Sequence, residues 1–116
     1  MSEDVSKIWI SAGEASGDLH GALLAEALRA RNPGLSLAGM GGPAMVGAKV
    51  DVRFSMRQLS LVGGTEILSS LPRILKLLRD TRKTFEEFQP QAVVVIDSPD
   101  FHFHVVRRAR ALGIPV

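Results

Sequence analysis

Short β-type runs alternate along the chain with stretches whose apolar residues recur at helical spacing. The runs predict strands at residues 7–12, 35–40, 50–54 and 91–96. Helical spacing and turn residues predict helices at 17–31, 66–88 and 99–112 and a short helix opened by Pro43, and they leave 55–64 unassigned. Because strands that alternate with helices form parallel sheets, we expect an α/β fold with a doubly wound, mainly parallel sheet and helices on both faces.

The apolar patterns also predict which faces these elements bury. Residues 91–96 are apolar on both faces, which is typical of a central strand covered by helices. Residues 50–54 alternate as a half-buried or edge strand does. Apolar residues share one arc of the first helix (Leu19, Leu23, Leu24, Ala27, Leu28) and an inner stripe of the last (Phe101, Val105, Ala109, Leu112).

Length and composition narrow the class of protein. A chain of 116 residues with 46% hydrophobic residues fits one compact domain. The absence of cysteine excludes disulfides, thiolate zinc sites and cysteine nucleophiles. A formal charge of +2 is low for a nucleic-acid-binding protein, so no nucleic-acid partner is expected. No apolar run is long enough to cross a bilayer and no signal-peptide layout opens the chain, so we expect a cytoplasmic protein.

The turn after the first predicted strand is the first candidate site. It carries Gly13, Glu14, Ser16, Gly17 and Asp18. Its glycines allow close backbone approach and the helix start offers free N–H groups, so an anionic or polyhydroxyl ligand fits. The turn is neither a dinucleotide fingerprint nor a Walker A loop, because the required glycine and lysine patterns are absent. A capped turn, with Ser16 or Asp18 as the helix cap, explains the same residues equally well.

Two later turns also follow predicted strands. Gly41 and Gly42 come after the second strand, where a plain tight turn is the simpler interpretation. Asp97 ends the strand at 91–96, beside a helix start, where a carboxylate can act as a general base. Ser98 suits the helix N-cap, and by spacing alone Asp100 fits the helix start better than a catalytic role.

The histidines of the last helix do not predict a metal site. His102 and His104 are two residues apart on a helix and point in different directions. His102 projects on the inner side, within reach of Asp97, whereas His104 should be solvated. A plain first-turn role explains both.

The long helix at 66–88 is amphipathic and basic. Its apolar arc contains Leu68, Leu71, Ile74, Leu75, Leu78 and Phe85, and much of the other face is basic (Arg73, Lys76, Arg79, Lys83). A core-facing helix explains this arc about as well as contact with an anionic membrane surface does.

Four segments, taken together and in order, resemble the lipid-A-disaccharide synthase family. They are residues 13–18 (GEASGD), 39–45 (GMGGPAM), 61–68 (LVGGTEIL) and 96–101 (IDSPDF). The family consists of GT-B glycosyltransferases, in which two Rossmann-like domains face each other across a cleft. The resemblance is to the amino-terminal part, so it implies one Rossmann-like, acceptor-side domain at 1–116 that is incomplete at its carboxyl end.

The resemblance also implies a reaction and roles for residues. The reaction transfers 2,3-diacylglucosamine from its UDP derivative to 2,3-diacylglucosamine 1-phosphate and releases UDP, with no cofactor and no metal. Asp97 would be the catalytic base, and the remaining matched positions would bind substrate (Gly13, Glu14, Ser16, Gly17, Asp18, Gly41, Gly42, Asp100). His102 stands where the family motif commonly continues with Asn. Acylated substrates imply peripheral contact with the inner membrane through Leu68, Leu71, Ile74, Leu75 and Leu78.

Two other hypotheses stay open beside this one. The alternative to the glycosyltransferase is a non-catalytic α/β binding or assembly module derived from the same fold. A free-standing nucleotide- or phosphate-binding domain is disfavoured by the carboxylates of the first turn. A half-enzyme exposes one wall of its cleft, so we expect no turnover by the chain alone and possible self-association.

Overall fold

A computed structural model of the protein describes residues 6–60 and 67–116. In this part of the chain, four parallel strands form one sheet in the order β3-β2-β1-β4. The strands are β1 (Lys7–Ala12), β2 (Ser36–Gly41), β3 (Asp51–Ser55) and β4 (Ala92–Ile96). The helices are α1 (Ala15–Arg31), α2 (Pro43–Gly47), α3 (Arg57–Ser60), α4 (Ile67–Phe88) and α5 (Pro99–Ala111).

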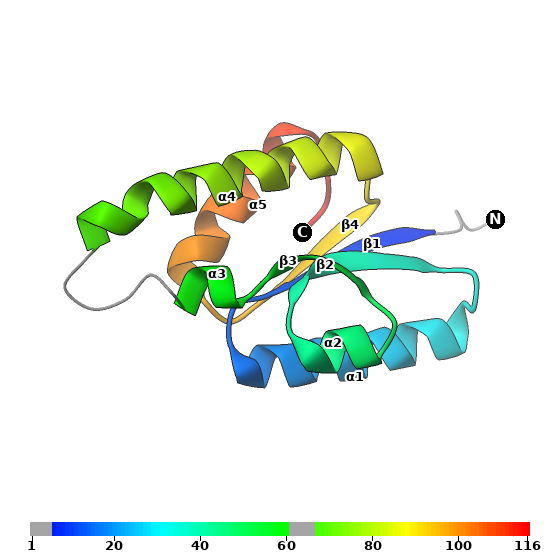
Figure 1. Ribbon diagram of the computed structural model, residues 1–116. Helices are drawn as coiled ribbons and strands as arrows, with labels where there is room; N and C mark the ends of the chain where they lie inside the picture. Colours follow the sequence, from blue (N-terminus) through cyan, green and yellow to red (C-terminus); the bar gives the residue numbers. More distant parts are fainter. Residues whose placement is uncertain (1–5, 61–66) are drawn as a thin grey trace.

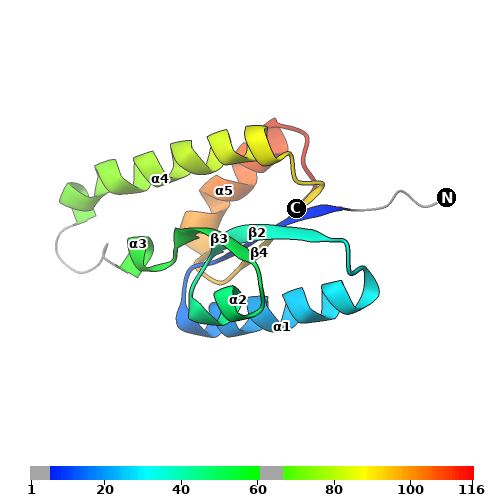
Figure 2. The same cartoon turned by 45° about the vertical axis from the view of Figure 1, so that its right-hand side comes forward.

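Helices cover both faces of this sheet. Figures 1 and 2 show α1 and α2 together on one face and α4 and α5 together on the other. Each face has its own apolar core: Ile10 and Met45 belong to the first, and Trp9 and Phe85 to the second. The side chains of Trp9 and Ile10 point to opposite faces because successive strand residues alternate. The predicted doubly wound α/β class is confirmed.

Most predicted elements lie within a residue or two of their observed bounds, and β3 has the alternating burial of an edge strand. The unassigned stretch contains the short helix α3, and Pro72 lies inside α4. The predicted central position of residues 91–96 is not seen among the four described strands, where β4 pairs with β1 alone. The Val93 N–H also donates to the carbonyl of Pro115, and the residues of β4 other than Val93 are half-buried. Residues 61–66 of the third family motif lie outside the described residues.

The packing of α1 differs from the arc of leucines in its sequence. Leu19 and Leu23 are each 55% exposed, and small residues line the buried face instead (Gly17, Gly21, Ala22, Ala25). A Cβ on Gly21 would stand 2.8 Å from the Met45 sulfur, so α1 lies too close to α2 for a larger residue there. Close approach of the backbone therefore selects small residues for the inner face and leaves Leu19 and Leu23 outside. Leu24 and Leu28 of the predicted arc are half-buried and pack against the first core.

Some residues of the apolar arc of α4 pack in the core, and others are exposed to solvent. Leu78 and Phe85 are 2% and 1% exposed, whereas Leu71 and Leu75 are 47% and 49% exposed. Leu78 therefore packs in the core, which does not fit its predicted place in a membrane-contact surface, and the side chain of Leu68 lies outside the described part. Ile74 is half-buried and packs against the same core.

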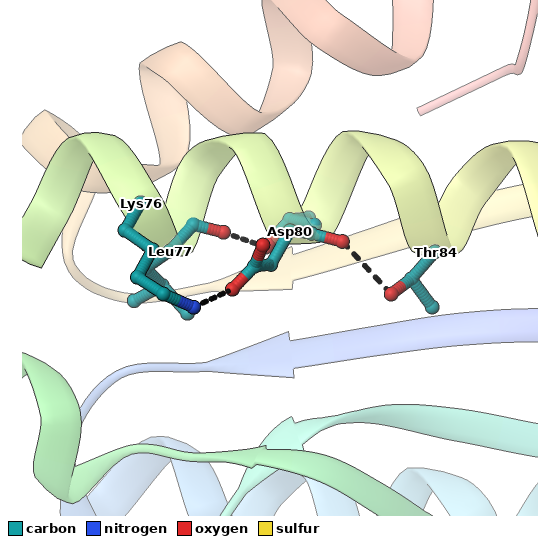
Figure 3. A network of polar contacts seen from close by, with 5 residues as sticks. Lys76, Leu77, Asp80 and Thr84 are labelled. Atoms are coloured by element: carbon teal, nitrogen blue, oxygen red, sulfur yellow. Dashed lines mark hydrogen bonds and ion pairs between the residues drawn. The ribbon is translucent and has the colours of Figure 1, made fainter.

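Polar residues on α4 are satisfied within the helix. Thr84 donates a hydrogen bond to the carbonyl of Asp80, and the Lys76 ammonium pairs with the Asp80 carboxylate at 2.7 Å (Figure 3). The buried hydroxyl of Thr81 likewise bonds to the carbonyl of Leu77. These local bonds let threonines face the core without leaving an unpaired polar group.

Candidate functional site

Two turns meet where the strand order of the sheet reverses. From β1 the chain moves outward through β2 to β3, and then returns to place β4 on the other side of β1. In open parallel sheets, ligands bind at such a switch point, beyond the carboxyl ends of the strands. Ala12 and Ile96 end these two strands in register, so the next residues, Gly13 and Asp97, stand side by side.

The carboxylate of Asp97 is fixed against the first turn. Its Oδ1 accepts a hydrogen bond from the backbone N–H of Gly13 at 2.8 Å. Its Oδ2 is buried and has no hydrogen-bond partner among the described residues. A Cβ on Gly17 would stand only 1.8 Å from Oδ2, so the carboxylate contacts the backbone at the start of α1. Gly17 is therefore required by this contact.

The backbone of the β4–α5 turn is strained. Asp97 and Ser98 both have left-handed conformations, with φ of 56° and 44°. Each such non-glycine residue costs on the order of 1–3 kcal/mol, and positions of this kind concentrate at functional sites. Ser98 occupies the predicted N-cap position of α5, but its hydroxyl makes no capping hydrogen bond.

His102 lies beneath this turn and is 2% exposed. Its Nδ1 is 2.6 Å from the carbonyl oxygen of Asp97, and its Nε2 is 2.7 Å from the hydroxyl of Ser11 on β1. A carbonyl only accepts hydrogen bonds, so Nδ1 carries the proton and the Ser11 hydroxyl donates to Nε2. Burial lowers the pKa of His102, against the opposing effects of its bond to the Asp97 carbonyl and the Asp97 charge. The ring is therefore neutral near pH 7.

Asp18 has a structural environment that differs from that of Asp97. Its two carboxylate oxygens accept hydrogen bonds from the backbone N–H groups of Gly42, Ala44 and Met45, each at 2.9 Å. The residue is 4% exposed, and it caps the start of α2 instead of its own helix. The predicted cap of α1 by Ser16 or Asp18 is wrong, since Glu14 is the N-cap residue and makes no side-chain hydrogen bond.

The sequence of the chain was compared with known proteins. The family model described as lipid-A-disaccharide synthetase matches residues 8–116. The chain belongs to the lipid-A-disaccharide synthase family. Lipid-A-disaccharide synthases of Myxococcus xanthus and Methylobacillus flagellatus are 42% and 40% identical to it over 110 and 108 residues, or 95% and 93% of the chain. The chain spans 29% of the length of each of these relatives.

The predicted substrate-binding residues of this lipid-A-disaccharide synthase family member fall into two groups. Glu14, Ser16 and Asp100 are exposed around the switch point, where a ligand can reach them. The others are buried, as is Asp18 (Gly13, Gly17, Gly41, Gly42). A Cβ on Gly42 would stand 2.8 Å from Oδ2 of Asp18, so Gly42 is needed for the close contact between this turn and Asp18.

The Ser11–His102 pair is not predicted by the sequence. Its one signal was the inward projection of His102 from the last helix, whereas Ser11 is an ordinary strand residue in the sequence. His104 is exposed, as predicted. Within residues 6–60 and 67–116, no three histidine or acidic side chains gather as metal ligands, and no helix there is long and apolar enough to span a bilayer.

Proposed function

We propose that this chain forms the acceptor-side domain of a GT-B glycosyltransferase that makes the lipid A disaccharide. In this reaction the acceptor is 2,3-diacylglucosamine 1-phosphate and the donor is UDP-2,3-diacylglucosamine. Membership of the family supports the reaction class. The observation that carries the proposal is the Asp97 carboxylate at the switch point, fixed through one oxygen and unpaired at the other.

Asp97 is the base in the proposed mechanism. The acceptor hydroxyl oxygen forms a bond to the anomeric carbon of the donor while the bond from that carbon to UDP breaks. The hydroxyl proton passes to the Asp97 carboxylate, and UDP leaves with the electron pair of the broken bond. The hydrogen bond from the Gly13 N–H holds the carboxylate in place during the transfer.

Polar groups around Asp97 suit an acceptor sugar. Glu14, Ser16 and Asp100 are exposed and carry acceptor oxygens or a hydroxyl that can bond to sugar hydroxyls. The start of α1 adds free backbone N–H groups. We assign these groups to the orientation of the acceptor.

The test is turnover by a chimera that continues this chain with the remainder of the Myxococcus xanthus relative. Asp97→Asn keeps the size of the side chain but cannot take the proton, so kcat should fall by roughly 10²–10⁴. Acceptor binding should be retained. Asp51→Asn, at an exposed aspartate of β3, is the control, with kcat within about threefold of the unmodified chimera. Near-normal kcat for Asp97→Asn would remove Asp97 as the base.

A second candidate function is a non-catalytic binding or assembly module of the same fold. The exposed Leu19 and Leu23 of α1 favour it, because outward apolar residues mark contact surfaces. Measurable turnover by the unmodified chimera would decide for the enzyme.

Peripheral attachment to the inner membrane from the cytoplasm completes the proposal. Leu71 and Leu75 are exposed, and Arg79 and Arg82 follow on the same helix. Apolar side chains with nearby guanidinium groups suit an anionic lipid surface, where acylated substrates reside.

A further inference from the structure

We propose that His102 is a positioning residue for Asp97, because its ring links the Asp97 carbonyl to Ser11 and so fixes the turn that carries the carboxylate. The proposal rests on the assigned role of Asp97 as the base. His102 does not touch the open side of the site, since it is buried beneath the turn. Its effect on the reaction is therefore exerted through Asp97.

The turn needs such a support. Asp97 and Ser98 adopt consecutive left-handed conformations, and neither is a glycine. A conformation of this kind persists only when surrounding contacts stabilise it. Three hydrogen bonds support the turn. Gly13 donates to the Asp97 carboxylate, the His102 ring donates to the Asp97 carbonyl, and the His102 backbone N–H donates to the Ser98 carbonyl.

The ring can act as a rigid link because both of its nitrogens are used. Nδ1 donates to Asp97, and Nε2 accepts from Ser11, which lies on the central strand of the sheet. The side chains of Ser11 and His102 are both 2% exposed, so water does not compete for these bonds. The turn is thereby tied to a strand that has a neighbouring strand on each side.

Two substitutions separate the two bonds. In His102→Asn, the amide nitrogen lies at the same distance along the side chain as Nδ1, so the bond to Asp97 can form and the bond to Ser11 is lost. In His102→Gln, the terminal amide lies where Nε2 lies, so Ser11 keeps a partner and Asp97 does not. His102→Ala removes both bonds.

The readout is hydrogen exchange and the chemical shift of the Gly13 amide in this chain, measured by NMR. We expect Gln and Ala variants to lose about tenfold or more of the Gly13 protection and the Asn variant to retain most of it. The Gly42 amide is the matched control, because it also donates to a buried aspartate, Asp18, on the other face of the sheet. Its protection should stay unchanged in all three variants.

Three results would overturn the proposal. The first is equal protection of Gly13 in the Asn and Gln variants, or no change in Ala. The second is loss at Gly13 and Gly42 together in every variant, which would mean a general structural role. The third needs no variant: imidazole ¹⁵N shifts of the unmodified chain that place the proton on Nε2 would rule out the assigned bonds.

Turnover by the chimera links the positioning role to the reaction. We expect kcat to follow the order Asn above Gln and Ala, with KM for the acceptor changed less than about threefold. Equal kcat in all three variants would overturn the link. If Asp97→Asn itself keeps normal kcat, the proposed function fails, while the amide measurements still decide whether His102 holds the turn.

Discussion

Two aspartates near the switch point differ in how many hydrogen bonds their carboxylates accept. Asp18 uses both carboxylate oxygens on three backbone N–H groups, so both oxygens are occupied within the protein. Asp97 uses one oxygen on Gly13 and keeps the other unpaired. A carboxylate that accepts three backbone hydrogen bonds stabilises a turn, whereas one that accepts a single bond can still act as a base. The number of hydrogen bonds that each carboxylate accepts thus distinguishes the structural aspartate from the proposed base.

The role of Asp18 predicts a large loss of stability on substitution. Asp18→Ala leaves the N–H groups of Gly42, Ala44 and Met45 without an acceptor, which should lower the free energy of unfolding by roughly 3 kcal/mol or more. Asp18→Asn should cost less, about 1–2 kcal/mol, because its carbonyl replaces one of the two oxygens. Urea denaturation measures both. A loss below about 1 kcal/mol in Asp18→Ala would contradict the capping role.

His102 predicts a pH dependence of stability. Burial holds the pKa of His102 below its ordinary value of 6.5 in the folded chain, so below pH 6.5 the unfolded chain binds a proton that the folded chain does not. Stability is therefore complete above this pH, falls as the pH drops, and stops falling below the folded pKa. The slope from one group is at most about 1.4 kcal/mol per pH unit.

Denaturation from about pH 5 to 8 checks this prediction. His102→Asn has no titrating ring, so the difference in stability between variant and parent should change with pH below 6.5 and be constant above it. A difference that stays constant through the whole range would contradict the assignment. The comparison with the variant cancels the contributions to stability that the two proteins share.

At the residue scale, the sequence predicted the site only where topology determines it. Gly13 and Asp97 each follow a strand, and adjacent parallel strands place their carboxyl ends together. No sequence rule predicts that Asp18 bonds to residues 24 to 27 positions away, or that Asp97 and Ser98 are left-handed. Those features depend on how the turns pack, which a local pattern does not contain.

At the element scale, α1 shows that large apolar side chains do not always mark the buried face of a helix. The leucines share an arc, but the distance between α1 and α2 decides which residues face inward. Gly17, Gly21 and Ala25 recur every four residues, and this small-residue row is the buried face. Rows of small residues mark close packing between helices, so this row indicates the buried face of α1 better than the leucines do.

Helix α4 carries the prediction for membrane contact. Replacing exposed Leu71 and Leu75 together by Ser should change the free energy of unfolding by less than about 1 kcal/mol. Binding to vesicles that contain anionic lipid should weaken about tenfold or more, because each leucine loses apolar burial in the bilayer. Vesicle sedimentation measures the binding, and circular dichroism follows the fold.

Leu78→Ser on the same helix is the matched control. Leu78 is 2% exposed, so this change should destabilise the fold by about 2–5 kcal/mol. If the double variant binds vesicles as well as the parent does, α4 does not use these leucines for membrane contact. If the double variant unfolds, Leu71 and Leu75 belong to the core.

At the scale of the whole molecule, the sequence predicted the layers of sheet and helices. It did not predict the position of β4 among the described strands. Alternation of strands and helices indicates a parallel sheet with both faces covered, as the two cores confirm. The apolar run of β4 suggested a central strand, yet β4 pairs with β1 alone among the described strands. Apolar residues on both faces report that helices cover a strand, and they do not report how many strands pair with it.

Self-association is the prediction that belongs to the whole molecule. Leu19, Leu23 and Val46 are each more than half exposed on helices that cover the same sheet face, so a second copy could bury them. The weight-average sedimentation coefficient should therefore rise with concentration. Leu23→Glu places a charge on this face and should keep the chain monomeric, whereas Glu26→Gln on the same helix, the control, should not. A monomer at all concentrations would contradict association through α1.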